Sequence, residues 1–422
     1  MTANQDRIRA SAAHLAEAAA PSAVLSATPS VTLIVSLVLA TALGPLAMSS
    51  FIPAIPFIQD HFAVSTTTAQ LTLTLSMLAM AFTSLAYGGL ADRYGRKPVL
   101  IAGITLAVAG SLVCAAAPNV WVVIVGRILQ SGGASAGMVL TRVIVRDVYG
   151  DERSVSILAY VTAAMAIAPL VGPILGGYLI DYFGWRAIFL AVAALATLLT
   201  GLLALRLPET RPAHLAAARP GKAFAAGQYK VLLARFPYVR YTIYGAMMQG
   251  IFMAFIGGAP YVATEVFQLS AAAYGWHFMV APIGYLTGSL IAGRFGSRLS
   301  REPLLTTGAL LAVIVCAVAL WTTFQPWFGA WTFFMPMFVL SCVIGLVFPS
   351  AQVGLLISGG EQAGAASGLF SFVQLAVGAL LAQTVGALLD FGPIAVSAVM
   401  TGAAVVALAA IAMRPPCGES PG

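Results

Sequence analysis

The segment GGLADRYGRKPVL at positions 88–100 separates two long apolar stretches of the chain. Residues 69–89 and 98–117, which overlap its two ends, contain no charged side chain. Each stretch has about 20 mostly apolar residues, the length of a helix that crosses a bilayer. The segment therefore predicts a short basic loop, with Arg93, Arg96 and Lys97, between two membrane-spanning helices.

The same pattern of apolar stretches and short polar interruptions continues along the whole chain. Of its 422 residues, 60% are hydrophobic and only 8% are charged, a balance typical of proteins whose solvent is a membrane. Backbone groups in hydrocarbon must bond internally, and the ten-residue alternation of a barrel strand does not appear, so we predict an all-α polytopic membrane protein. We place twelve spans at 31–55, 69–89, 98–117, 119–145, 155–180, 187–207, 238–263, 273–293, 304–323, 328–357, 363–388 and 393–413.

Basic residues indicate which ends of these spans face the cytosol. The first 30 residues lack a cleavage site behind a short apolar core, so we interpret them as a cytosolic tail rather than a signal peptide. With that start, every Lys and Arg except Arg127 and Arg186 falls in a cytosolic segment, as the positive-inside rule requires. We expect a bacterial inner-membrane protein with both termini cytosolic, whose net charge of +7 needs no nucleic-acid partner.

A polar linker divides the spans into two sets of six. The longest polar interruption covers 208–237, and GRFGSRLSREPLL at 293–305 repeats Gly, Arg, Arg, Pro and Leu of the first loop in register. Two parallel halves are typical of transporters that rock around a central site. We predict a tail at 1–30, halves at 31–207 and 238–413, the linker between them, and a cytosolic tail at 414–422.

Three strings carry a family resemblance. The first loop offers Gly88, Asp92, Arg93, Gly95, Arg96 and Lys97; a loop that only set topology would explain its basic residues but not its Gly and Asp positions. GRILQSGG at 126–133 places Arg127 and Gln130 inside a span. APLVGPILGG at 168–177 contributes Pro169, Gly172, Pro173, Gly176 and Gly177, of which ordinary helix packing would explain only the glycine spacing.

These strings resemble motifs of the major facilitator superfamily. Together with IPAIP at 52–56, LPET at 207–210 and weaker similarities in the second half, they look like the bicyclomycin-resistance (Bcr/CflA) exporters. The resemblance implies a major facilitator fold, and the string at 168–177 resembles a motif regarded as marking drug and proton antiporters. It therefore implies proton-coupled efflux of small molecules by alternating access.

The chain departs from that subfamily at the first span. The resemblance implies an Asp four residues before the first proline of IPAIP, but Ser49 stands there, at a depth comparable with Arg127. A charge inside a span costs about 2.5 to 3.5 kcal/mol on insertion scales, so we expect Arg127 to face a wet interior; a residue that snorkels to the outer boundary is the alternative.

No carboxylate lies in the middle of a span, which leaves the proton carrier open. His277 is the one histidine within a span and a candidate, although a hydrogen-bonded interface histidine is an equally good interpretation. Without a fixed acid near Arg127, we expect neutral or anionic cargo. Polar and aromatic span residues provide candidate cavity walls, each with packing as its alternative: Tyr244, Gln249, Phe252, Phe255, Tyr261, Trp276 and Gln374.

Other classes of protein fit less well. The sequence contains no phosphate-binding loop of the kind that an ATP-driven pump needs. It also contains no cluster of carboxylates, no set of metal ligands and no nucleophile with its base, so we predict no enzyme activity, metal or cofactor. The four cysteines are scattered and interpreted as packing residues. We expect a monomer in the bilayer that binds protons and a small molecule; a proton-coupled or facilitative transporter of a sugar, amino acid or other metabolite is the alternative.

Overall fold

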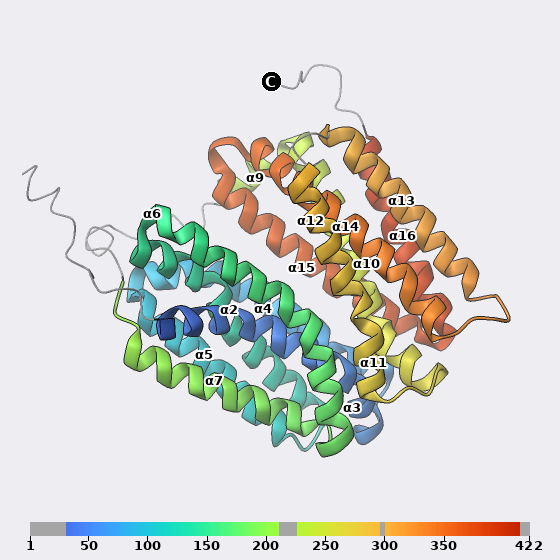
Figure 1. Ribbon diagram of the computed structural model, residues 1–422, viewed down its shortest axis with the longest axis horizontal. Helices are drawn as coiled ribbons and strands as arrows, with labels where there is room; N and C mark the ends of the chain where they lie inside the picture. Colours follow the sequence, from blue (N-terminus) through green and yellow to red (C-terminus); the bar gives the residue numbers. More distant parts are fainter. Residues whose placement is uncertain (1–30, 211–225, 296–299, 414–422) are drawn as a thin grey trace, which may run out of the picture.

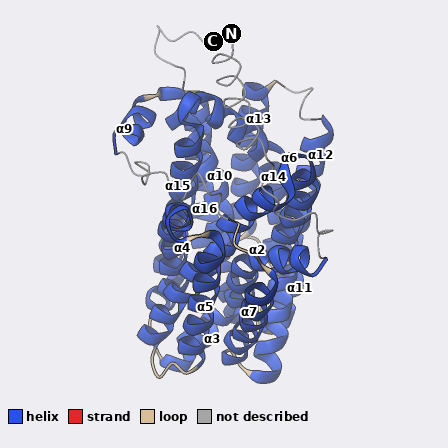
Figure 2. Ribbon diagram, turned by 90° about the vertical axis from the view of Figure 1, so that its left-hand side faces the viewer, coloured by secondary structure: helices blue, strands red, loops and turns tan. Residues whose placement is uncertain are grey.

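The computed structural model describes residues 31–210, 226–295 and 300–413, and every regular element in these ranges is a helix. Figure 2 shows these helices joined by short loops, with no strand in the described parts. The elements are α2 Val31–Phe51, η1 Ile52–Ala54, α3 Ile55–Phe62, α4 Thr66–Tyr94, α5 Arg96–Ala115, α6 Val120–Phe183, α7 Arg186–Arg206, α9 Ala226–Ala234, α10 Phe236–Tyr261, η2 Val262–Val266, α11 Ala271–Phe278, α12 Val280–Phe295, α13 Arg301–Thr322, α14 Ala330–Gly359, η4 Gly360–Gln362, α15 Ala363–Leu388, η5 Leu389–Phe391 and α16 Pro393–Ala412.

The predicted all-α polytopic fold is confirmed. Eleven helical segments among the described residues are long and apolar enough to cross a bilayer. The remaining predicted span, 155–180, lies in α6, where Ile167–Phe183 is apolar but shorter. The first span extends past its predicted end to Phe62, because Pro53 and Pro56 occupy the first turns of η1 and α3, where a missing N–H is tolerated.

Helix α6 reverses direction and supplies two antiparallel arms. Arg127 Nη1 donates to the Ala47 carbonyl at 3.4 Å, and Ser49 Oγ donates to the Ala168 carbonyl at 3.1 Å. Residues 127 and 168 are 168 − 127 = 41 positions apart, which is roughly 60 Å along a straight helix. Both contact α2 within two residues of each other, so the chain turns back between them. The predicted fourth and fifth spans are these two arms.

The helices form two groups. Helices α2 to α7 pack together on one side of Figure 1, and α10 to α16 pack together on the other. Glycines allow the closest approaches within each group: a Cβ at Gly137 would lie 2.0 Å from the Ala40 carbonyl oxygen, and one at Gly288 would lie 2.0 Å from that of Cys342. The predicted boundaries of the halves remain predictions, because residues 211–225 of the linker and 296–299 of the repeated loop lie outside the described residues.

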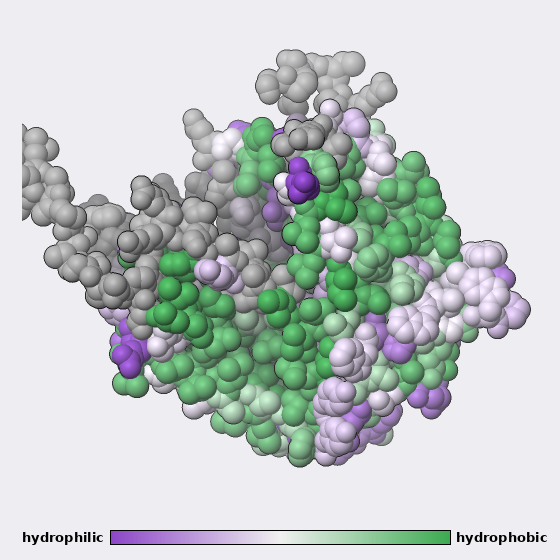
Figure 3. Space-filling model, in the orientation of Figure 1, coloured by the Kyte–Doolittle hydropathy of each residue, from purple (hydrophilic) through white to green (hydrophobic). Residues whose placement is uncertain are grey.

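The most extensive contacts between the groups are those of α4 with α15 and of the second arm of α6 with α11. Apolar residues cover most of the described part of the face in Figure 3. Large side chains such as Leu205, Leu290 and Phe183 are mostly exposed, which suits contact with lipid tails rather than with water. The chain is thus a multi-pass membrane protein.

Candidate functional site

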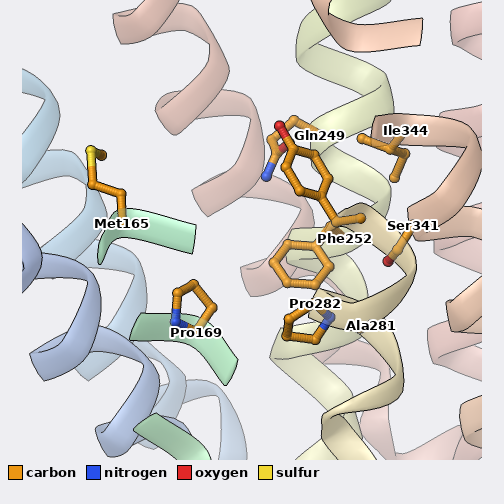
Figure 4. A pocket seen from close by; sticks show the side chains of 9 residues that line it. Met165, Pro169, Gln249, Phe252, Ala281, Pro282, Ser341 and Ile344 are labelled. Carbon is orange, nitrogen blue, oxygen red and sulfur yellow. The ribbon is translucent and has the colours of Figure 1, made fainter. Parts of the chain in front are cut away.

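The site is built around a pocket where the two groups of helices face each other. The pocket has a volume of about 150 Å³, and residues of α6, α10, α12 and α14 line it. Figure 4 shows Met165 and Pro169 of α6 across the pocket from Phe252 and Pro282. The full lining is Met165, Pro169, Gln249, Phe252, Ala281, Pro282, Tyr285, Ser341 and Ile344. It contains three neutral polar side chains and no charged one.

Arg127 is buried inside the first group of helices and is not part of the pocket lining. Its side chain is 1% exposed, so it neither snorkels to the outer boundary nor faces lipid. Nη1 donates to Gln130 Oε1 at 2.6 Å, and Gln130 Nε2 donates to Ser111 Oγ at 2.8 Å. The guanidinium carbon lies 4.0 Å from the ring centroid of Phe51. Hydrogen-bonded polar groups of α2, α5 and α6 therefore hold the guanidinium in place. The sequence predicted that Arg127 faces a water-filled interior, whereas the structure buries it between helices.

Ser49 links this buried cluster to the pocket. Its hydroxyl donates to the carbonyls of Ala168 at 3.1 Å and Leu46 at 3.3 Å. Ala168 precedes Pro169, which lines the pocket. A Cβ at Gly172 would lie 1.9 Å from Ser49 Oγ, so the glycine of the 168–177 string is what lets α6 approach α2 here. The comparable depth expected for Ser49 and Arg127 agrees with the hydrogen bond from Arg127 to the Ala47 carbonyl, two residues before Ser49.

His277 lies outside the pocket, in an aromatic environment on α11. Its Nδ1 is 2.8 Å from the Ala273 carbonyl, and its ring centroid is 4.8 Å from that of Trp331 and 5.4 Å from that of Phe334. The adjacent Trp276 is mostly exposed and donates to the Tyr178 hydroxyl at 3.4 Å. Neither residue lines the pocket.

The other predicted cavity residues divide in the same way. Gln249 and Phe252 line the pocket. Tyr244, Phe255, Tyr261 and Gln374 do not line it. Tyr244 is buried and donates to the Leu305 carbonyl at 3.1 Å, and the ring of Phe255 packs against three other phenylalanines of its group. Tyr261 is buried, whereas Gln374 is half-buried. Periodicity marks all four as span residues but not which side of the helix meets the partner group.

Sequence reasoning missed the walls on α12 and α14. Ala281, Pro282, Tyr285, Ser341 and Ile344 complete the pocket. Their helices approach closely, because a Cβ at Gly284 would lie 2.3 Å from the Phe338 carbonyl oxygen and one at Gly345 would lie 2.3 Å from that of Tyr285. Small residues recurring in both helices signal that the helices touch, and a polar residue beside such a stripe is the signal for a pocket wall.

The loop at 88–100 holds the ends of several helices of the first group together. Arg96 is buried; its Nη1 donates to Asp92 at 2.7 Å and its Nε to Asp147 at 3.2 Å. Its backbone N–H donates to Glu209 Oε1 at 2.9 Å. Gly95 has a φ of +102°, a conformation that a side chain would strain, so glycine suits this position for a backbone reason. The loop thus does more than carry positive charge.

The polar contacts between the two groups lie at the opposite end of the molecule from this loop. The backbone amides of Ala271 and Ala272, which begin α11, donate to the Asp181 carboxylate at 3.2 and 3.0 Å. Gln383 of α15 accepts from Thr74 Oγ1 at 2.8 Å and donates to the Thr67 carbonyl at 3.0 Å. Thr67 lies in the first turn of α4 and the loop follows its last turn, so these polar contacts lie at the end of the molecule far from the loop.

A match to a known family decides the class of protein. The family model of the Major Facilitator Superfamily matches residues 37–383 of the chain. The chain belongs to this superfamily. It is therefore a transporter rather than an enzyme, as the sequence predicted.

Relatives of this major facilitator protein include drug-resistance proteins. It is 30% identical over 346 residues to the MFS-type transporter YdgK of Bacillus subtilis, covering 82% of this chain and 86% of that one. It is 25% identical over 365 residues to a bicyclomycin resistance protein homologue of Haemophilus influenzae, covering 84% and 89%. A crystal structure of a D-xylose-proton symporter has the same fold, with a TM-score of 0.71 at 14% identity over 89% of this chain and 96% of that one.

Proposed function

We propose that this major facilitator protein exports small drug-like molecules across the bacterial inner membrane in exchange for protons. The observation that carries the proposal is the neutral, mostly apolar pocket between the two groups, with Pro169 of the 168–177 string in its wall. A drug-sized molecule needs an apolar cavity with a few polar groups that orient it, and Gln249, Tyr285 and Ser341 are such groups. The relationship to a bicyclomycin resistance protein homologue supports the same proposal.

The direction of access follows from the proposed orientation. With both termini and the 88–100 loop in the cytosol, Asp181 and Gln383 join the two groups at the outer end, and the pocket opens toward the cytosol. Cargo enters from the cytosol or the inner leaflet, the two groups rock, and cargo leaves outside. Proton binding resets the cycle. Coupling requires that proton and cargo each change the balance between the inward-open and outward-open states.

We propose neutral or anionic compounds as cargo. The pocket lining has no carboxylate to hold a cation. The positively charged Arg127 is outside the lining and contacts α2, the helix that also touches Ala168 beside the pocket wall. A carboxylate in the pocket would favour lipophilic cations, and none is present in its lining. Everted vesicles, in which export appears as uptake into the lumen, test this point. The native protein should take up chloramphenicol-like neutral compounds and should not take up ethidium-like cations. Strong ethidium export by the native chain that disappears in Ser49→Asp would contradict it.

A metabolite transporter is the competing proposal. A sugar carries many hydroxyl groups, each of which needs a partner once buried, whereas this pocket offers three polar side chains. The relationship to the xylose symporter structure concerns the fold, which many cargoes share. The pocket therefore favours apolar cargo over sugars.

A drug-susceptibility panel in an efflux-deficient bacterial host tests the export function. Expression of the native chain should raise the inhibitory concentration of at least one neutral drug, and Gln249→Ala or Phe252→Ala should reduce that rise severalfold. Phe324→Ala is the control, because Phe324 is mostly exposed and does not line the pocket. A pH-sensitive dye in everted vesicles tests coupling: adding the drug should release protons from the vesicle interior. A drug flux without a proton flux would support export and contradict the proposed coupling to protons.

A further inference from the structure

One edge of the Arg127 guanidinium lacks a partner. Nη1 is bonded to Gln130 and Ala47, but Nε and Nη2 make no hydrogen bond with any described residue. These two adjacent nitrogens form the edge that arginine presents to carboxylates and other anions in a two-pronged grip. The side chain is 1% exposed, so bulk water does not solvate the edge.

The positive charge of this group is also unbalanced. The ion pairs among the described residues join Arg96 to Asp92 and Asp147, and Arg240 to Glu302; none includes Arg127. Its contacts are the face of the Phe51 ring, an amide oxygen and a backbone carbonyl, all of them neutral. A buried cation without a counter-charge is destabilising by several kcal/mol even after relaxation. The arrangement therefore favours binding of a negative charge.

The unpaired edge belongs to a cluster that reaches the pocket wall. Ser49, two residues along α2 from the Ala47 carbonyl, donates to the carbonyl of Ala168, and Pro169 next to it lines the pocket. The segment of α2 that contacts Arg127 on the first arm of α6 therefore also contacts the second arm next to the pocket wall.

We propose that the Nε–Nη2 edge of Arg127 binds a monovalent anion. The anion is either a small inorganic ion such as chloride or the carboxylate of a bound cargo molecule, since both offer one negative charge to two adjacent N–H donors. The bound anion supplies the negative charge that no described side chain supplies. This site goes beyond the proposed export function and does not depend on its direction or on its coupling ion.

Thermal stability of the purified full-length protein in detergent tests the site. A ligand that binds only the folded state raises Tm in proportion to the logarithm of its concentration. Replacing gluconate by chloride at constant ionic strength should raise the Tm of the native protein by about 2 to 5 °C. Sodium benzoate, added to the gluconate buffer at equal ionic strength, tests an apolar carboxylate, because gluconate carries hydroxyl groups that favour water over a buried site. A shift with chloride identifies a free ion, and a shift with benzoate alone identifies the carboxylate of a cargo.

Two variants separate the site from general salt effects. Arg127→Gln removes the charge and should abolish the anion-dependent shift, and Arg127→Lys, which keeps the charge without the two-pronged edge, should reduce it. Arg206→Gln changes an exposed arginine and should keep the native shift. Equal Tm values of the native protein in all three salts, or an unchanged shift in the folded Arg127→Gln variant, overturn the proposal. The measurement needs no transport, so neither result changes the test of the export function.

Discussion

The interiors of the two groups of helices differ in kind. In the first group, Arg127, Gln130 and Ser111 form a buried polar chain around a full positive charge. In the second group, Phe255 packs against Phe278, Phe333 and Phe334, with ring centroids 5.4 to 6.3 Å apart. The first arrangement costs stability and is retained for a task that needs charge, whereas the second stabilises the helices that form most of the pocket wall. For the proposed export function, we therefore expect the charge-dependent step in the first group and cargo contact mainly in the second.

The largest effect is expected at Arg127. Arg127→Leu should return drug resistance in the efflux-deficient host to the level of the empty vector, a loss of at least about tenfold. Its Tm should stay the same or rise, because replacing a buried charge by an apolar residue removes a desolvation cost. Susceptibility assays and thermal unfolding in detergent measure the two properties, with the exposed Arg206→Leu as control. An Arg127→Leu variant with native drug resistance would contradict the claim that transport depends on the charge buried in the first group.

The aromatic cluster should respond in the opposite way. Phe255→Ala should lower stability by about 1 to 3 kcal/mol, less than in a water-soluble core, because the membrane is itself apolar and chiefly the packing term is lost. Part of the drug resistance should remain, since Phe255 does not line the pocket. Thermal unfolding is the measurement, and the exposed Phe324→Ala is the control. A complete loss of transport at native stability would show that the two interiors are not specialised as described.

A smaller effect is expected where the two groups meet. Asp181→Asn keeps the shape of the side chain but removes the charge that caps the first amides of α11, which should weaken the closed outer end by about 1 kcal/mol. Spin labels at Tyr182→Cys and Val266→Cys, in a background without the native cysteines, measure the separation of the two groups there. The longer distance should gain population. Asp390→Asn, which changes an exposed carboxylate in η5, should leave the distances unchanged.

The smallest effect is expected at Gln383. Gln383→Ala removes two neutral hydrogen bonds between α15 and α4, each contributing about 0.5 to 1.5 kcal/mol at most. The same pair of labels should show a shift to the longer distance that is smaller than in Asp181→Asn. A shift larger than that of Asp181→Asn would place the main closing contact between α4 and α15 instead of between α6 and α11.

The sequence alone predicted the class of fold and most of the elements. The length of an apolar stretch defines a span, because backbone groups in hydrocarbon can bond only within the helix. The spans on either side of the 88–100 loop and the span that contains Cys316 therefore needed no tertiary information. The sequence also predicted that Ser49 and Arg127 lie at the same depth, since depth follows from position along a helix of known rise. Its account of the cavity was partial: Gln249 and Phe252 line the pocket, but Trp276 faces outward.

Tertiary structure decided which faces of the helices meet. In a span that is apolar all round, periodicity does not distinguish the side toward lipid from the side toward another helix. The contacts that make the distinction join residues far apart in sequence, such as Ser49 with Ala168 and Asp181 with Ala271. For the same reason, the sequence showed that Arg127 lacks a nearby acid, but only the packing of α2, α5 and α6 showed which nitrogens of its guanidinium are paired and which are not.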